Sequence, residues 1–160
     1  MEKPDELALR LRQVFLDGKW ITNTNYKELL EDVDWDMANK KVADLNTLLA
    51  LTFHINYYLA GVLNVLKGGE LEIRDKFSYD FQHIDNAAKW ESLKSEMNSN
   101  AAEFISKVEK MSESELDGPF IVEKYGTYRR NIEGIIEHSY YHLGQMVVKE
   151  TSFLTLDAGS

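Results

Sequence analysis

The sequence contains no cysteine. This absence excludes disulfide bridges, thiolate metal ligands and a cysteine nucleophile, and it fits a reducing compartment. Residues that break helices are also scarce, with 2 prolines and 9 glycines among 160 residues. Both prolines, Pro4 and Pro119, lie where helices would begin or be separated.

Basic residues are too few and too scattered for a nucleic-acid-binding surface. The formal net charge is −9 at pH 7, whereas a nucleic-acid binder needs a basic stripe to neutralise phosphates. The densest basic spots are two isolated pairs, Lys40-Lys41 and Arg129-Arg130. We therefore expect no nucleic-acid partner, and anionic membrane surfaces are disfavoured for the same reason.

Long apolar runs are missing as well. The best run, residues 48–66, is interrupted by His54, Asn56 and Asn64, so no membrane span is predicted. The first six residues are mostly charged and show no signal-peptide pattern. We therefore expect a cytoplasmic protein.

What the sequence does contain is typical of one soluble globular domain. Apolar residues make up 44% of the chain and charged residues 28%, which is unlike a disordered protein. A chain of this length can bury about two-thirds of its unfolded surface. With no internal repeat or low-complexity segment, residues 1–160 are predicted to form a single domain.

Apolar residues recur at three- and four-residue spacing along four segments, which predicts helices. These cover residues 5–16, a long stretch from near Asp34 or Asp36 to Leu66, residues 87–110 and residues 127–150. Residues 26–33 add a short helical turn, and Gly68-Gly69 end the second long helix. Residues 70–85 show no clear period and are expected to form an ordered crossover loop. The fold class predicted is all-α, a four-helix bundle with this long loop between its second and third helices.

Three of the four histidines lie within predicted helices. His138 and His142 are four residues apart, which puts both imidazoles on one face, where they can chelate one ion. His54 lies in the apolar stretch 51–58, and an unsatisfied polar group buried there would cost about 1–3 kcal/mol. Mid-helix residues of a bundle meet at one level, so the three side chains predict a three-imidazole metal site. Ordinary buried histidines, bonded to a tyrosine hydroxyl or a carbonyl, stay open as the alternative.

Two familiar kinds of metal site do not fit these residues. A zincin needs glutamate directly after the first histidine, but Glu137 precedes His138 and points about 100° away on the helix. A ferritin-like di-iron bundle needs two Glu-x-x-His motifs, and here Ile135 and Ser139 stand three residues before His138 and His142.

Two polar residues share a face of the predicted last helix with the histidine pair and support a functional site on that face. Asn131 and Gln145 fall near both histidines on a helical wheel, and Gln145 could hydrogen-bond a metal-bound water or substrate. Gly144 costs helix stability of about 1 kcal/mol relative to alanine, which we interpret as close approach of another backbone. Solvation of the two amides, and helix packing at the glycine, are the alternatives.

The pattern resembles the DinB-like (DinB/YfiT) superfamily of metal-binding four-helix bundles. The similarity lies in His54 within residues 51–58, in the string Glu137-His-Ser-Tyr-Tyr-His-Leu-Gly-Gln145, and in helix order along nearly the whole chain. The resemblance implies that His54, His138 and His142 hold Zn²⁺ or Ni²⁺, with water or substrate completing the coordination shell. The resemblance also implies that the protein forms a homodimer. Members of the superfamily include transferases and isomerases that use low-molecular-weight thiols, so the resemblance implies a similar reaction here.

Three hypotheses about function follow. The first is a metal-dependent enzyme that activates a thiol or a water for S-transfer or hydrolysis of a small molecule. Its candidate catalytic residues are Tyr57, Tyr58, Tyr141 and Gln145, with aromatic packing as the alternative role of the tyrosines. The second is a non-catalytic metal-binding module for stress response or interaction. The third is a metal-free helical domain that dimerises through its aromatic residues.

The crossover loop bears on the second hypothesis. A structural zinc site is normally closed by four protein ligands, and the chain has no cysteine for that role. Asp75 or Asp80 could supply a loop carboxylate, whereas His83 has no assigned role.

Overall fold

The computed structural model describes residues 2–159, apart from the side chains of residues 154–158. Within this part of the chain every regular element is helical. The elements are α1 (Pro4–Phe15), α2 (Tyr26–Glu31), α3 (Trp35–Asn39), α4 (Leu48–Leu66), the 3-10 turn η1 (Asp75–Phe77), α5 (Ala87–Glu109), α6 (Glu113–Leu116), the 3-10 turn η2 (Glu123–Tyr125) and α7 (Tyr128–Ala158). One isolated β-bridge joins Pro119 to Thr127 in the described residues.

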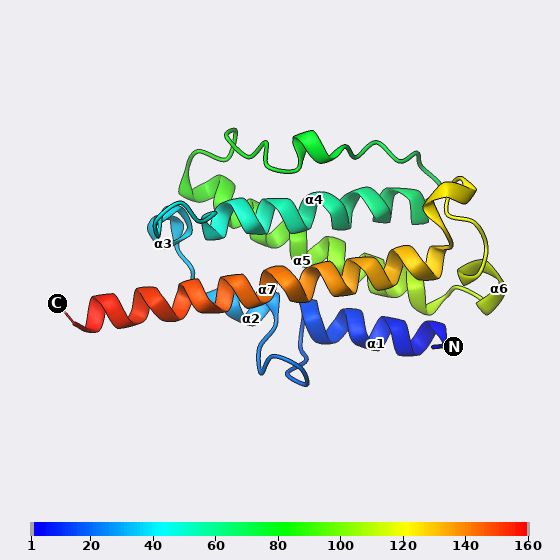
Figure 1. Ribbon diagram of the computed structural model, residues 1–160, viewed down its shortest axis with the longest axis horizontal. Helices are drawn as coiled ribbons and strands as arrows, with labels where there is room; N and C mark the ends of the chain where they lie inside the picture. Colours follow the sequence, from blue (N-terminus) through cyan, green and yellow to red (C-terminus); the bar gives the residue numbers. More distant parts are fainter. Residues whose placement is uncertain (1, 160) are drawn as a thin grey trace.

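Four long helices pack in a closed ring, in the order α1, α5, α4 and α7 (Figure 1). Helices α4 and α5 run in one direction, and α1 and α7 run in the opposite direction. Because α4 and α5 are parallel neighbours, the chain must travel back along the bundle between them. Residues 70–85 make this return along the outside of α4 and form the crossover loop.

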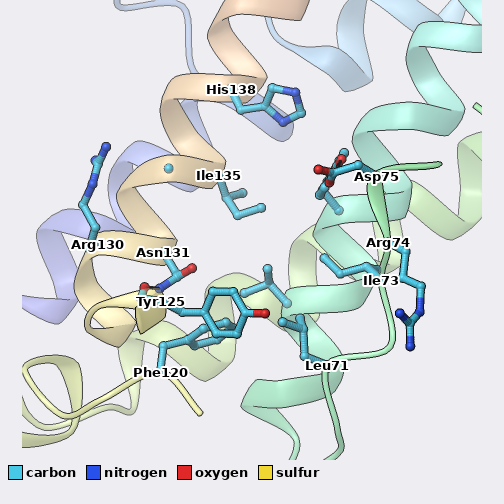
Figure 2. Close-up of a pocket in the computed structure, with 13 residues that line it drawn as sticks. Leu71, Ile73, Arg74, Asp75, Phe120, Tyr125, Arg130, Asn131, Ile135 and His138 are labelled. Carbon is cyan, nitrogen blue, oxygen red and sulfur yellow. Dashed lines mark hydrogen bonds between the residues drawn. The ribbon is translucent and has the colours of Figure 1, made fainter. Parts of the chain in front are cut away.

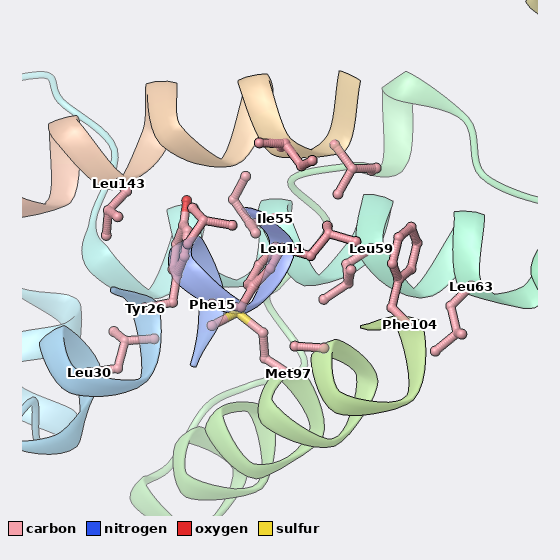
Figure 3. Close-up of a cluster of buried hydrophobic side chains, with 14 of the residues drawn as sticks. Leu11, Phe15, Tyr26, Leu30, Ile55, Leu59, Leu63, Met97, Phe104 and Leu143 are labelled. Atoms are coloured by element: carbon pink, nitrogen blue, oxygen red, sulfur yellow. The ribbon is translucent and has the colours of Figure 1, made fainter. Parts of the chain in front are cut away.

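The core fills the space inside this ring (Figure 3). Side chains from each of the four helices meet there with Tyr26 from α2, and each such burial is worth about 1.5–3 kcal/mol. They include Leu11 and Phe15 of α1, Ile55 and Leu59 of α4, Met97 and Phe104 of α5, and Leu143 of α7. The Tyr26 hydroxyl donates to the Ser139 carbonyl at 2.6 Å. This bond ties α2 to α7 between the two histidines of the last helix.

Most predicted helices agree with the structure. Helices α1 and α5 match their predicted ranges to within one residue at each end. Gly68, with a φ of 89°, follows the end of α4 as expected. Helix α7 starts after its cap Thr127 as predicted but runs beyond residue 150 to Ala158. Nothing after residue 150 stops it until Gly159, and Phe153 continues the buried face.

The predicted start of the second long helix is wrong. Helix α3 ends at Asn39, whose side chain donates to the Trp35 carbonyl at 2.9 Å, and α4 starts only after Thr47. Ala43 between them has a φ of 49°, outside the helical region. The Thr47 hydroxyl accepts from the Ala50 amide, which makes it the true N-cap. Leu45 lies within the range predicted for the second long helix, but it is exposed in this connection.

Helix α4 alone is long and apolar enough to cross a membrane among the described residues. However, 72% of its most apolar window is buried inside the protein. A core helix of a bundle passes the same test of length and composition, so the helix is weak support for a membrane span.

Candidate metal centre

Neighbouring helices α4 and α7 bring the three predicted histidines together. His138 Nε2 lies 3.1 Å from His54 Nε2 and 3.0 Å from His142 Nε2. One ligand atom from each ring falls within 4.8 Å of the other two. His54 and His142 are buried and His138 is half-buried. The three side chains can therefore hold a metal ion between them.

The hydrogen-bond partners of Nδ1 in His54 and His142 determine which nitrogen of each ring carries the hydrogen. His54 Nδ1 is 3.2 Å from the Ser78 carbonyl oxygen, which only accepts, so this nitrogen donates. His142 Nδ1 lies 2.7 Å from Oε1 of Gln145 and donates in the same way. With the hydrogen on Nδ1, Nε2 of each neutral ring presents a bare lone pair.

These two lone pairs converge on His138. Its Nε2 carries at most one hydrogen, which can serve only one of its two neighbours. At least one pair of nitrogens therefore faces each other with no hydrogen between them, an arrangement that a shared cation relieves. Two ligands of a tetrahedral zinc, at about 2.0–2.1 Å from the ion, lie about 3.3 Å apart. The observed separations of 3.1 and 3.0 Å are close to this value.

A proton on His138 or His54 does not readily take the place of a metal cation between these nitrogens. Burial, with the neighbouring His142 and His54, lowers the pKa of His138 to about 4. Burial and His142 also lower the pKa of His54, although the Ser78 carbonyl partly opposes this. Both rings are therefore neutral at pH 7, the form that binds metal.

The crossover loop supports His54 from outside. Besides the Ser78 carbonyl, it places the Tyr79 ring flat against the imidazole, with centroids 4.2 Å apart and an interplanar angle of 14°. Ser78 itself is buried. Neither residue was predicted from the sequence, because the loop has no period that shows which side chains face inward. The loop's length was the one available signal of a role.

Of the four candidate catalytic residues, Tyr58 contacts two of the three histidines and also lines a cavity beside His138. Its ring contacts His54 and His138 at centroid distances of 5.1 and 5.3 Å. Its hydroxyl donates to an Asp75 carboxylate oxygen at 2.7 Å. Burial, and then this hydrogen bond, raise the pKa of Tyr58 to about 12, so the hydroxyl keeps its hydrogen at neutral pH.

The other three candidates have different surroundings. The Tyr57 hydroxyl is bonded to the Arg74 backbone, accepting from its amide at 2.9 Å. The ring of Tyr141 contacts His142, but the side chain is 67% exposed. Gln145 accepts from His142 Nδ1 through its Oε1 and so orients a histidine, and its predicted bond to a metal-bound water or substrate stays a prediction.

The remaining residues singled out from the sequence lie outside the cluster. Asn131 donates to the carbonyls of Tyr125 and Thr127 at the start of α7. The interpretation of Gly144 is wrong, because a Cβ there would meet nothing within 4 Å. Among the described residues, the histidine cluster includes no carboxylate and no fourth histidine. The predicted loop carboxylates Asp75 and Asp80 thus do not close the site, and His83 lies outside it as well.

A cavity of about 660 Å³ opens beside His138 (Figure 2). Figure 2 shows His138 and Ile135 of α7 on one side, facing the crossover-loop residues Ile73 and Asp75 on the other. Its lining mixes polar and apolar side chains, and Arg74, Tyr125 and Asn131 lie toward the end away from His138. The apolar lining is Val62, Leu71, Ile73, Phe120 and Ile135. The volume suits a small molecule.

No model of a known protein family, no curated protein and no solved structure matches this chain. The established findings are therefore the all-helical fold and the buried cluster of three histidines that can hold a metal ion.

Proposed function

We propose that this protein is a divalent-metal-dependent enzyme of the DinB-like superfamily that acts on a small molecule. The observation that carries the proposal is the convergence of three Nε2 atoms, two of them with bare lone pairs set by Ser78 and Gln145. All-imidazole donors suit zinc and nickel equally well. The helix order and the histidine spacing support the superfamily assignment.

A catalytic role is favoured over a structural one because the ligand set is incomplete. Structural zinc sites have four protein ligands, whereas catalytic sites have three and leave one position open. At this cluster the described residues supply three histidines, and no fourth histidine, aspartate or glutamate side chain joins them. The open side has a place to receive a substrate, since the cavity of about 660 Å³ reaches His138.

Residues around the cavity supply the remaining chemical functions. A divalent ion bound by three neutral imidazoles lowers the pKa of a thiol or a water and so provides a nucleophile near pH 7. Tyr58 presents a hydroxyl with its hydrogen retained, and the Asp75 carboxylate fixes its direction. Because Asp75 takes the one hydroxyl hydrogen of Tyr58, the hydroxyl oxygen is placed to accept a hydrogen bond from a substrate, while the mixed polar and apolar lining holds the rest of the molecule. Thiol transfer and hydrolysis both fit this arrangement.

The test is an activity screen of the full chain loaded with zinc or with nickel. Transfer of a low-molecular-weight thiol to an electrophile and hydrolysis of activated esters would be measured, with and without chelator. We expect metal-dependent turnover in one of these assays. Tyr58→Phe should lower kcat by about 10²-fold at unchanged metal content, and His54→Ala should remove both metal and turnover.

Tyr140→Phe is the matched control, because Tyr140 lies on α7 and packs against the core. Turnover that persists in chelator, or that is unaffected by Tyr58→Phe, would contradict the respective assignment. Binding of metal with no turnover in any assay would favour the non-catalytic module.

A further inference from the structure

Lys149 on α7 is a buried cation without a partner. Its side chain is 4% exposed, and its Nζ makes no hydrogen bond within the described part of the chain. A buried charge in this state is costly, and removing such a group often stabilises a protein. Burial, and then the nearby Lys41, lower the pKa of Lys149.

Lys149 lines a second cavity, of about 450 Å³. It lies between α7 and the connection that precedes α4, and it shares no lining residue with the cavity beside His138. Its apolar lining comes from Leu45, Leu51 and Val148, of which Leu45 and Val148 are 56% and 66% exposed. Gly144 adds open space, because a Cβ there would meet nothing. The remaining lining residues are Asp44, Asn46 and Gln145.

We propose that this cavity binds a small monocarboxylate with an apolar chain. The ammonium group of Lys149, which is closed to solvent in this structure, would turn into the cavity to pair with the carboxylate, and the apolar chain of the ligand would cover Leu45 and Val148, two side chains now open to water. A charge-assisted hydrogen bond would satisfy the orphaned ammonium group.

The lining favours one negative charge over two. Lys149 supplies one ammonium group, and Asp44 lines the same cavity, so a dianion such as a phosphate monoester would meet repulsion there. Asp44 does not pair with Lys149 itself. The amides of Asn46 and Gln145 can donate to the second carboxylate oxygen. Gln145 also bonds His142, so the ligand would lie one side chain away from the metal centre.

The experiment is a titration of the full chain with octanoate and with octanol, followed by amide NMR shifts and calorimetry. It is done in chelator and again with zinc, so that its outcome does not depend on the metal site. We expect octanoate to shift the amides of Gly144 and Val148, and octanol to bind more weakly. Lys149→Met should weaken octanoate binding at least about tenfold and should leave octanol binding unchanged.

Stability provides the second measurement. Lys149→Met removes an unpaired buried charge, so its melting temperature should equal or exceed that of the wild type. Lys94→Met is the matched control, because Lys94 Nζ donates to the carbonyls of Leu30 and Val33. This control should melt lower and bind octanoate normally.

Three results would overturn the proposal. These are equal octanoate affinity in Lys149→Met, octanoate shifts confined to other residues, and no octanoate binding by the wild type. A monomer–dimer equilibrium that depends on Lys149, with no octanoate binding, would show instead that a second chain covers this surface.

Discussion

At the scale of single residues, the geometry of the candidate metal centre depends on groups outside the three histidines. The Ser78 carbonyl and the Gln145 amide hold hydrogens on the outer nitrogens of His54 and His142. Such partners fix both the tautomer and the orientation of the ring before metal arrives. Because these side chains are already ordered, less conformational entropy is lost when an ion binds, and the affinity for the ion is higher.

Replacing Gln145 tests this role directly. Gln145→Ala removes the acceptor for His142 Nδ1, so zinc affinity should fall by about 10–100-fold. Competition with a chromophoric chelator measures the change. Gln82→Ala, at an exposed position of the crossover loop, is the control and should bind zinc as the wild type does. Equal affinities in both variants would show that Gln145 does not orient His142.

The lowered pKa of His138 predicts a pH dependence of stability in the metal-free protein. This pKa is about 4 in the folded chain, whereas an unfolded histidine titrates near about 6.5. Between these values the unfolded state binds more protons, so the free energy of unfolding falls as the pH drops from about 6.5 towards 4. His138→Gln should flatten this part of the profile, measured by chemical denaturation in chelator. An unchanged slope in that variant would assign the effect to other groups.

At the scale of the elements, the crossover loop lies directly against α4. A Cβ at Gly61, in the middle of that helix, would overlap the side chain of Ile73 in the loop. Glycine is therefore required by packing, despite its cost within a helix. The loop segment held here leads directly to Asp75, Ser78 and Tyr79.

Two glycine variants separate packing from helix propensity. Gly61→Ala should destabilise the protein by about 1–3 kcal/mol, because Ile73 must move. Gly144→Ala should stabilise the protein by about 0.5–1 kcal/mol. The added Cβ meets no neighbour in the folded chain, and alanine loses less backbone freedom on folding than glycine does. Denaturant melts of both variants against the wild type measure the difference. Effects of the same sign would contradict the close approach at Gly61.

The elements also show how far sequence reasoning reaches. Periodicity predicted α5 because its apolar side chains face the core at regular helical spacing, and Gly68-Gly69 predicted the end of α4. It failed at the start of α4, where Asn39 and Thr47 bond to nearby backbone and Leu45 faces solvent. These are local hydrogen-bonding choices that spacing alone does not show. Likewise, spacing suggested the three histidines but gave no sign of Ser78 or Tyr79.

At the scale of the whole molecule, the candidate metal centre lies beside a core built from apolar side chains of all four long helices. The ring of four helices buries its own apolar residues, and the histidines lie between α4, α7 and the crossover loop. The metal-free chain should therefore unfold cooperatively. An unfolded metal-free chain would instead indicate a structural metal.

Added zinc should raise stability only by mass action. At 100 times its dissociation constant, zinc adds about 2.7 kcal/mol, which corresponds to about 5–10 °C in melting temperature for a chain of this size. Scanning calorimetry of the wild type and of His142→Ala measures it. The variant should show no shift, and an equal shift in both would mean that zinc binds elsewhere.

The most direct test of the central claim is a calorimetric titration of zinc into the metal-free full chain. The wild type should bind one equivalent, and His54→Ala, His138→Ala and His142→Ala should each lose that binding while keeping their helix content. His83→Ala, which changes the fourth histidine, should bind as the wild type does. If any of the three histidine variants keeps wild-type stoichiometry and affinity, or if the wild type binds no zinc and no nickel, the three-histidine metal centre is contradicted.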